Sequence, residues 1–145
     1  MIDASNNHRR AISATLWLLD AMLCDFERWA TADEIHSVLY QQTNRLTPDQ
    51  SRAIREEVAA MRGLMARLRD DLHLEGRSED VGTMIQSYAR GYWATLVQTE
   101  SKCLRAYGDI PSELAAYLDP QMQALNEHLQ RIRRAAESPP PTPGT

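Results

Sequence analysis

The sequence predicts an all-α fold: an up-down-up-down four-helix bundle with one or two additional short helices. Three observations carry this prediction. Four stretches have apolar residues spaced alternately four and three apart, which fits helices that each bury one side. The connections between the long stretches are short, which favours antiparallel neighbours, and 145 residues suffice for one buried core. The four stripes are Ile12, Leu16, Leu19, Leu23, Phe26; Ile54, Val58, Met61, Met65, Leu68, Leu72; Val81, Ile85, Tyr88, Tyr92, Leu96, Thr99, Cys103; and Met122, Leu125, Leu129, Ile132, Ala136.

The first helix is predicted to begin near Asn6 or Asn7, either of which can cap it, and to run at least to Ala30. Thr31 and Glu34 then have the spacing of a capping box, in which a hydroxyl and a carboxylate satisfy the opening amides of a helix. Residues 35–42 are therefore expected to form a separate short helix or a kinked continuation of the first.

The second helix has the clearest start signal in the chain. Thr47 supplies a capping hydroxyl, Pro48 occupies the first helical position, and Gln50 is placed to reach back to the cap. We expect this helix to run to about Leu74, with Gly76 as a left-handed stop.

The third helix is predicted to start after a cap in residues 78–80, to run to Tyr107 and to stop at Gly108. A short helix is expected over 111–118. Asp119 and Pro120 repeat the pattern of a cap followed by proline, so the last helix is expected to begin there. Residues 1–137 are then one helical-bundle domain, and the proline-rich residues 138–145 are a disordered or polyproline-like tail.

Composition restricts the class of partner and the compartment. The 16 basic and 20 acidic residues are mixed along the helices and give a net charge of −4, which argues against nucleic acid as the main partner. The two cysteines, Cys24 and Cys103, do not make a secreted disulfide framework, so reduced thiols and a cytoplasmic location are expected. The longest apolar run, 16–19, is far below membrane-spanning length, and the first ten residues lack a standard export signal.

Two tryptophans fall outside the main apolar stripes and suggest an interface. Trp17 shares the opposite side of the first helix with arginines, and Trp93 lies on a secondary stripe of the third helix. These faces pack either against a protein partner, such as a second copy in a homodimer, or against residues 34–46 and 111–118 of the same chain. The interface candidates are Trp17, Cys24, Arg28, Arg90, Trp93, Val97 and Leu104.

Polar residues on the expected inward sides of the helices suggest an alternative, a ligand pocket. Glu57 lies among apolar residues of the second helix, and a buried carboxylate needs a partner. Tyr88, Tyr92 and His128 are the candidate partners, and with Glu57 they make up the predicted pocket. Asp20 and Glu100 would complete a carboxylate-rich metal set, but the Glu-x-x-His motif of dimetal bundles is missing, so we expect neither a metal nor a cofactor.

The sequence has no motif that identifies an enzyme. There is no glycine-flanked serine, no histidine within a helical turn of either cysteine, and no glycine-rich phosphate loop. This favours a non-catalytic protein without deciding the question. The function predicted by elimination is an intracellular protein-interaction or self-assembly module. The alternative is the binding of a small ligand or metal in a polar pocket of the bundle core.

Overall fold

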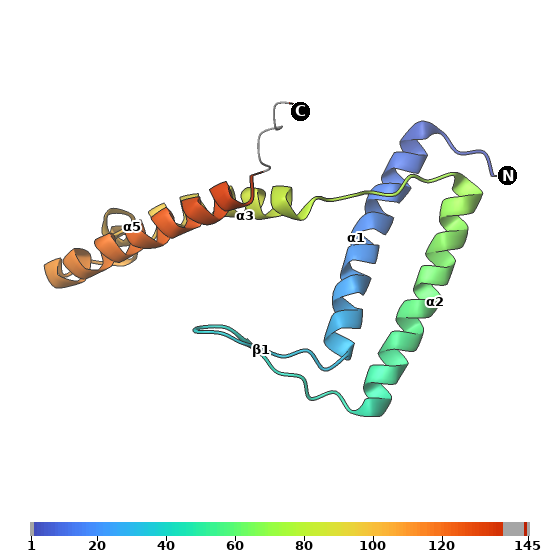
Figure 1. Cartoon of the computed structure of the whole chain (residues 1–145), viewed down its shortest axis with the longest axis horizontal. Coiled ribbons are helices and arrows are strands. Elements are labelled where there is room, and N and C mark those ends of the chain that lie inside the picture. The colour runs from blue at the N-terminus through green and yellow to red at the C-terminus, as the bar shows by residue number, and fades with distance from the viewer. Residues whose placement is uncertain (1, 138–143, 145) are drawn as a thin grey trace. The chain divides into compact units, whose positions relative to one another are not determined.

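The computed structural model describes residues 2–137 and residue 144, and it confirms the predicted all-α fold of packed helices (Figure 1). The four long helices of the described residues are α1 (Asn6–Ala30), α2 (Pro48–Leu72), α3 (Val81–Val97) and α5 (Ser112–Ala135). The short elements are β1 (Ile35–His36), β2 (Gln41–Gln42), α4 (Ser101–Leu104) and the 3-10 helix η1 (Arg105–Tyr107). None of the described helices is both long and apolar enough to cross a membrane.

The chain divides into two compact units, Met1–Arg77 and Ser78–Thr145, here called the N-terminal unit and the C-terminal unit. Each unit contains one pair of long helices, and each is described by itself. The single domain predicted for 1–137 stays a prediction. The predicted tail, 138–145, lies outside the described residues except for residue 144.

In the N-terminal unit, α1 and α2 run antiparallel, side by side (Figure 1). The first turns of α1 meet the end of α2, where Arg9 Nε donates to the carbonyl oxygen of Leu72 at 3.0 Å. The buried hydrophobic residues of this pair are Leu23, Ala30, Val58 and Leu72. This core is small, because a pair of helices can bury only the sides that face each other.

The ends of α1 and α2 confirm some of the predicted caps and correct others. Ser5 caps α1 by accepting from the amide of His8 at 3.2 Å, one residue before the predicted caps. Both hydrogen bonds of the capping box between Thr47 and Gln50 are present at the start of α2, as predicted. The far end of α2 lies at His73, whose backbone is left-handed (φ 52°, ψ 49°), so the prediction of Gly76 as the stop is wrong.

The prediction of a helix over 35–42 is also wrong. The hydroxyl of Thr31 donates to the carbonyl oxygen of Arg28 at 2.7 Å, so this residue ends α1 instead of capping a new helix. Glu34 accepts from the amide of Asn44 at 3.2 Å, which closes the loop. Between them β1 and β2 form a two-residue antiparallel ladder in which Ile35 pairs with Gln42.

In the C-terminal unit, α3 and α5 are the antiparallel pair. Gln86 Nε2, near the start of α3, donates to the carbonyl oxygen of Ala136, just after the end of α5, at 3.2 Å. Gly82 is needed at this crossing, because a Cβ there would lie 2.9 Å from the same carbonyl oxygen. Asp80 caps α3, inside the predicted cap region, by accepting from the amide of Thr83 at 2.9 Å.

The third helix is shorter than predicted and the last is longer. The helix α3 ends at Val97, where Thr99 turns its hydroxyl back to the carbonyl oxygen of Thr95 at 3.0 Å. The chain becomes helical again in α4 and η1. These short helices end at the predicted stop, Gly108, whose φ is 139°. The helix α5 runs from Ser112 through Pro120 without a break, so the predicted division into a short helix over 111–118 and a last helix from Asp119 is wrong.

Candidate interaction faces

The C-terminal unit has an apolar groove of about 400 Å³ on one side of the seam between α3 and α5. Every residue that lines it is aliphatic, sulfur-containing or a tyrosine. The lining consists of Val81, Met84, Ile85, Tyr88, Ala89, Tyr92, Leu129 and Ile132. Ala89 is 3% exposed and forms the floor, whereas Tyr88 and Tyr92 are 67% and 58% exposed and stand at the surface.

Helical periodicity extends this apolar surface beyond the groove. Residues seven positions apart lie on nearly one line along an α-helix. On α3 such lines join Tyr88 to Thr95 and Met84 to Gly91, and on α5 one joins Ile132 to Leu125. We call this surface the α3–α5 face. Its residues are those that line the groove together with Gly91, Thr95 and Leu125.

The other side of the same seam is polar. Arg90 and Trp93 line a hollow of about 360 Å³ with Gln130 and Arg133. Arg133 Nε donates to Gln130 at 2.9 Å, and Trp93 is 48% exposed. Arg90 is the only charged residue between Val81 and Val97, and it points to this side of α3. The structure thus brings together two of the predicted interface residues, Arg90 and Trp93.

One other interface candidate, Leu104, lies on a different element than expected. Trp93, Val97 and Leu104 were predicted to form one stripe on one helix. Because α3 ends at Val97, Leu104 belongs to α4 instead, and both Val97 and Leu104 are half-buried.

In the N-terminal unit, Trp17 and Cys24 line a hollow of about 480 Å³ between α1 and the end of α2. The indole Nε1 of Trp17 donates to the carbonyl oxygen of Glu75 at 3.0 Å, and the guanidinium of Arg77 lies 5.9 Å from the centre of the ring. Trp17 is half-buried as a result. The segment that contacts it, through Glu75 and Arg77, was not among those weighed from the sequence.

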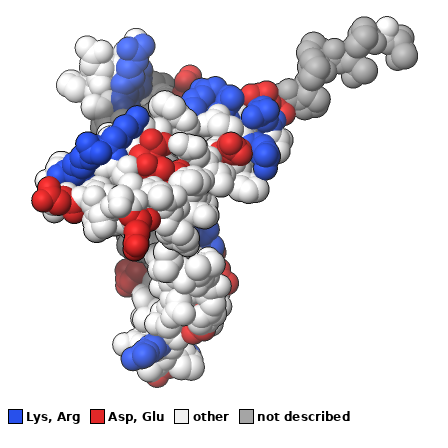
Figure 2. All heavy atoms as spheres, turned by 90° about the vertical axis from the view of Figure 1, so that its left-hand side faces the viewer, with Lys and Arg blue, Asp and Glu red and all other residues white. Residues whose placement is uncertain are grey.

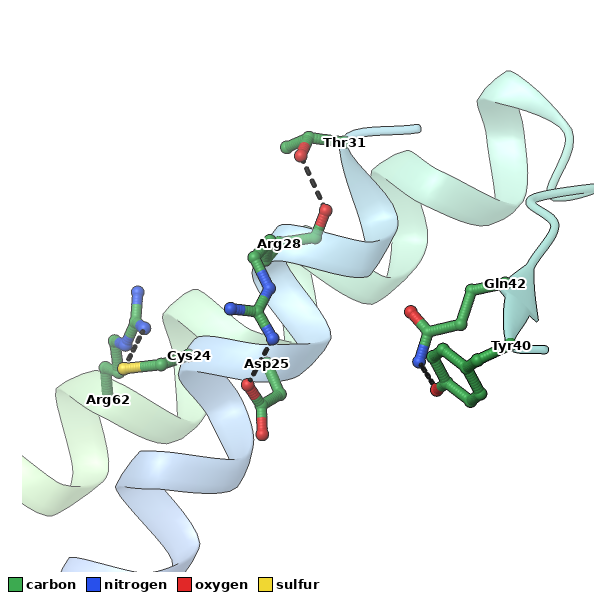
Figure 3. A network of polar contacts seen from close by, with 7 residues as sticks. All are labelled: Cys24, Asp25, Arg28, Thr31, Tyr40, Gln42 and Arg62. Atoms are coloured by element: carbon green, nitrogen blue, oxygen red, sulfur yellow. Dashed lines mark hydrogen bonds and ion pairs between the residues drawn. The ribbon is translucent and has the colours of Figure 1, made fainter. Parts of the chain in front are cut away.

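Polar contacts centred on Arg62 lie beside this hollow, and Figure 3 shows the one between Arg62 and Cys24. Arg62 pairs with Glu27 and lies 3.7 Å from Asp20, and its Nη2 donates to the Cys24 sulfur at 3.6 Å. The hydrogen bond that Arg62 donates to the Glu27 carboxylate raises the pKa of Arg62 above its ordinary value. Arg28, another interface candidate, is exposed and pairs with Asp25 of its own helix at 2.9 Å.

The N-terminal unit also leaves large apolar side chains uncovered. The hydrophobic residues exposed on its two long helices are Leu18, Met22, Phe26, Trp29, Leu64 and Leu68. Glu57 and Asp71 lie seven residues before and after Leu64, so this row along α2 carries two carboxylates. At the tip of the β-hairpin, Val38 and Leu39 are 93% and 99% exposed.

The predicted pocket residues are only partly brought together. Tyr88 and Tyr92 line the same groove, and His128 is exposed on α5 beside Arg131, with 3.4 Å between His128 Nδ1 and Arg131 Nη1. Glu57 belongs to the N-terminal unit and is exposed, so it is not the buried carboxylate that motivated the pocket. Within the described part of the chain, no three His, Cys, Asp or Glu side chains are grouped so that they could hold a metal.

Charges of both signs are mixed on the face of the molecule shown in Figure 2, with wide uncharged areas between them. Comparisons with protein families, with curated proteins and with solved structures find no match for this chain.

The sequence did not single out the α3–α5 face, because its stripe was read as core. The sequence nevertheless contained a signal for this face. The helix α3 has one charged residue in 17, so its solvent side has few side chains that interact favourably with water.

Proposed function

We propose that the chain is a cytoplasmic, non-catalytic protein-interaction or self-assembly module. The observation that carries this proposal is the α3–α5 face, an open apolar groove with two prominent tyrosines. Such a surface costs free energy in water, at about 25 cal/mol for each Å² of apolar area left exposed. Contiguous exposed apolar patches of this kind mark sites where proteins bind.

The chemistry of the face supports binding over catalysis. The groove offers contact area and two phenol groups, whereas no carboxylate, imidazole or thiol is among the residues that line it. Tyrosine is enriched at protein interfaces because its ring adds apolar area and its hydroxyl can still form a hydrogen bond at the rim. Proteins, including a second copy of the chain, are therefore the proposed partners, and the mixed surface charge favours neither nucleic acid nor an anionic membrane.

The alternative function, binding of a small ligand, keeps one supporting observation. Tyr88 and Tyr92 project into one groove of about 400 Å³, a volume in the range of ligand sites. The groove is open along the seam and lacks the convergent polar groups that orient a small ligand, so we rank this alternative second.

Native mass spectrometry of the gently purified chain tests the proposal, because one spectrum reports subunit count and retained mass. We expect two or more copies of the chain, or a stoichiometric protein partner, and no small-molecule adduct. A single chain that carries a stoichiometric small molecule would favour the alternative function. A bare single chain would call for a second measurement, the rate at which Tyr88 and Tyr92 are iodinated. If this rate in the native chain equals the rate in the urea-unfolded protein, the proposal is contradicted.

A further inference from the structure

The α3–α5 face differs in charge from the exposed apolar row on α2. On α2, the row through Leu64 carries Glu57 and Asp71, so the copies of this row would repel each other if two chains met there. The α3–α5 face has no Lys, Arg, Asp or Glu in any of its rows. This face can therefore meet an identical copy of itself without bringing like charges together.

The size of the face also suits a second copy. With 150–250 Å² available for each aromatic side chain, Tyr88 and Tyr92 together expose roughly 250 Å². A stable dimer buries about 800 Å² on each partner, so two tyrosines already supply almost a third of that area. Val81, at 68% exposed, and Ile132, at 53%, add aliphatic area on both helices.

We infer that the α3–α5 face binds the same face of a second copy of this chain, around a two-fold axis. The inference rests on the proposed function and names the partner. A two-fold pairing uses one self-complementary patch twice, so an uncharged face with apolar residues on both helices is the kind of patch it requires. Each copy contributes α3 and α5 to a four-helix interface, with Tyr88 and Tyr92 as anchors.

Gly91 provides a sharp test because it lies on the face without a packing role inside its own unit. A side chain at Gly91 would meet no atom within 4 Å of its Cβ, so Gly91→Arg leaves the α3–α5 pair intact. The same substitution places a charge and a long side chain against the second copy. The matched control is Gly63→Arg on α2, where a Cβ also meets nothing within 4 Å.

The experiment is sedimentation equilibrium of the full chain as wild type, Gly91→Arg and Gly63→Arg, with circular dichroism to verify equal helicity. We expect a wild-type dimer, an unchanged dimer for Gly63→Arg, and a Kd about 100-fold higher or more for Gly91→Arg, because the interface would bury an unpaired charge. A third substitution, Leu39→Arg, tests the exposed tip of the β-hairpin as a rival contact and should leave the dimer unchanged.

Two outcomes would overturn the inference in different ways. A dimer that Gly91→Arg does not weaken means that the copies meet elsewhere, and the proposed function then survives without this face as the dimer contact. A wild-type chain that stays monomeric at every concentration removes the second copy as the occupant. The native mass spectrum then decides the proposed function separately, by the presence or absence of another protein.

Discussion

His73 ends α2 in a left-handed conformation, which an L-residue with a side chain adopts at a cost. Its amide donates to the carbonyl oxygen of Arg69, and the amide of Leu74 donates to the same oxygen at 2.9 Å. This geometry is the one that glycine usually provides at a helix end. The chain has a glycine nearby, Gly76, but its φ is not left-handed.

Replacing His73 with glycine should therefore stabilise the protein. We expect His73→Gly to raise the free energy of unfolding by about 1 kcal/mol, because glycine removes the Cβ clash of the left-handed backbone. Urea-induced unfolding followed by circular dichroism measures the change. Gly76→Ala is the control and should change stability little, since a Cβ at Gly76 meets nothing within 4 Å. A loss of stability in His73→Gly would mean that the imidazole makes a contact that outweighs the strain.

The same residues show where prediction from sequence succeeds. The capping box of Thr47 and Gln50 was predictable because all its donors and acceptors lie within four consecutive residues. The stop at His73 was not, because nothing in a local pattern distinguishes a strained histidine from a helical one. Trp17 was recognised as unusual, yet its cover, the carbonyl of Glu75, is 58 residues away in the sequence.

Among the elements, the start of α4 receives its cap from a distant helix. Asp119 on α5 accepts from the amide of Ser101 at 2.8 Å and from its hydroxyl at 2.6 Å, and so caps α4 from outside. The sequence predicted that Asp119 is a capping residue, which is correct, but assigned the cap to its own helix. Local patterns identify the chemistry of such a residue, whereas the tertiary fold chooses which amide it serves.

The cap makes stability depend on pH in a defined direction. The hydrogen bonds from the Ser101 hydroxyl and then its amide hold the pKa of Asp119 below its ordinary value of 3.8, and Lys102 adds to this. Because the folded-state pKa is depressed, the contribution of Asp119 is complete above the unfolded-state pKa and is lost as the pH falls through the lower, folded-state value.

Asp119→Asn should thus lower the urea midpoint at neutral pH and flatten its fall below about pH 4. Unfolding curves of wild type and variant at several pH values between neutral and acid check this. Asp109→Asn, which changes an exposed loop carboxylate, serves as the control and should follow wild type. Parallel curves for wild type and Asp119→Asn would show that the cap does not contribute to folding.

The unbroken path of α5 through Pro120 gives a second prediction for an element. Proline has no amide hydrogen to donate to the carbonyl four residues earlier, Ala116, and its ring crowds that turn. The residue before the proline, Asp119, accepts two hydrogen bonds from Ser101. Pro120→Ala should stabilise the protein by roughly 1–3 kcal/mol, measured by urea unfolding. A destabilised variant would show that the chain relies on the rigidity of proline at this position.

For the whole molecule, periodicity predicted the helices and short connections predicted antiparallel pairs, and both are confirmed within each unit. The amount of buried surface could not be predicted. The apolar stripes were expected to be core, but Ala89 is the only buried hydrophobic residue of the described C-terminal unit. An apolar stripe indicates a helix face that avoids water. A face buried in a core and a face that binds a partner have the same pattern.

The dimer inferred for the α3–α5 face should respond to salt in a characteristic way. The contacts of this dimer are apolar, so salt has few ion pairs to screen. The net charge of −4 on each chain adds only a mild repulsion between the two copies, which salt reduces. We expect the Kd to change by no more than about threefold between about 0.05 M and about 0.5 M NaCl. Sodium sulfate, which strengthens apolar burial, should lower it. Sedimentation equilibrium across these salts measures the effect. A dimer that dissociates steadily as NaCl rises would instead be held by ion pairs, and this would contradict an apolar contact at the α3–α5 face.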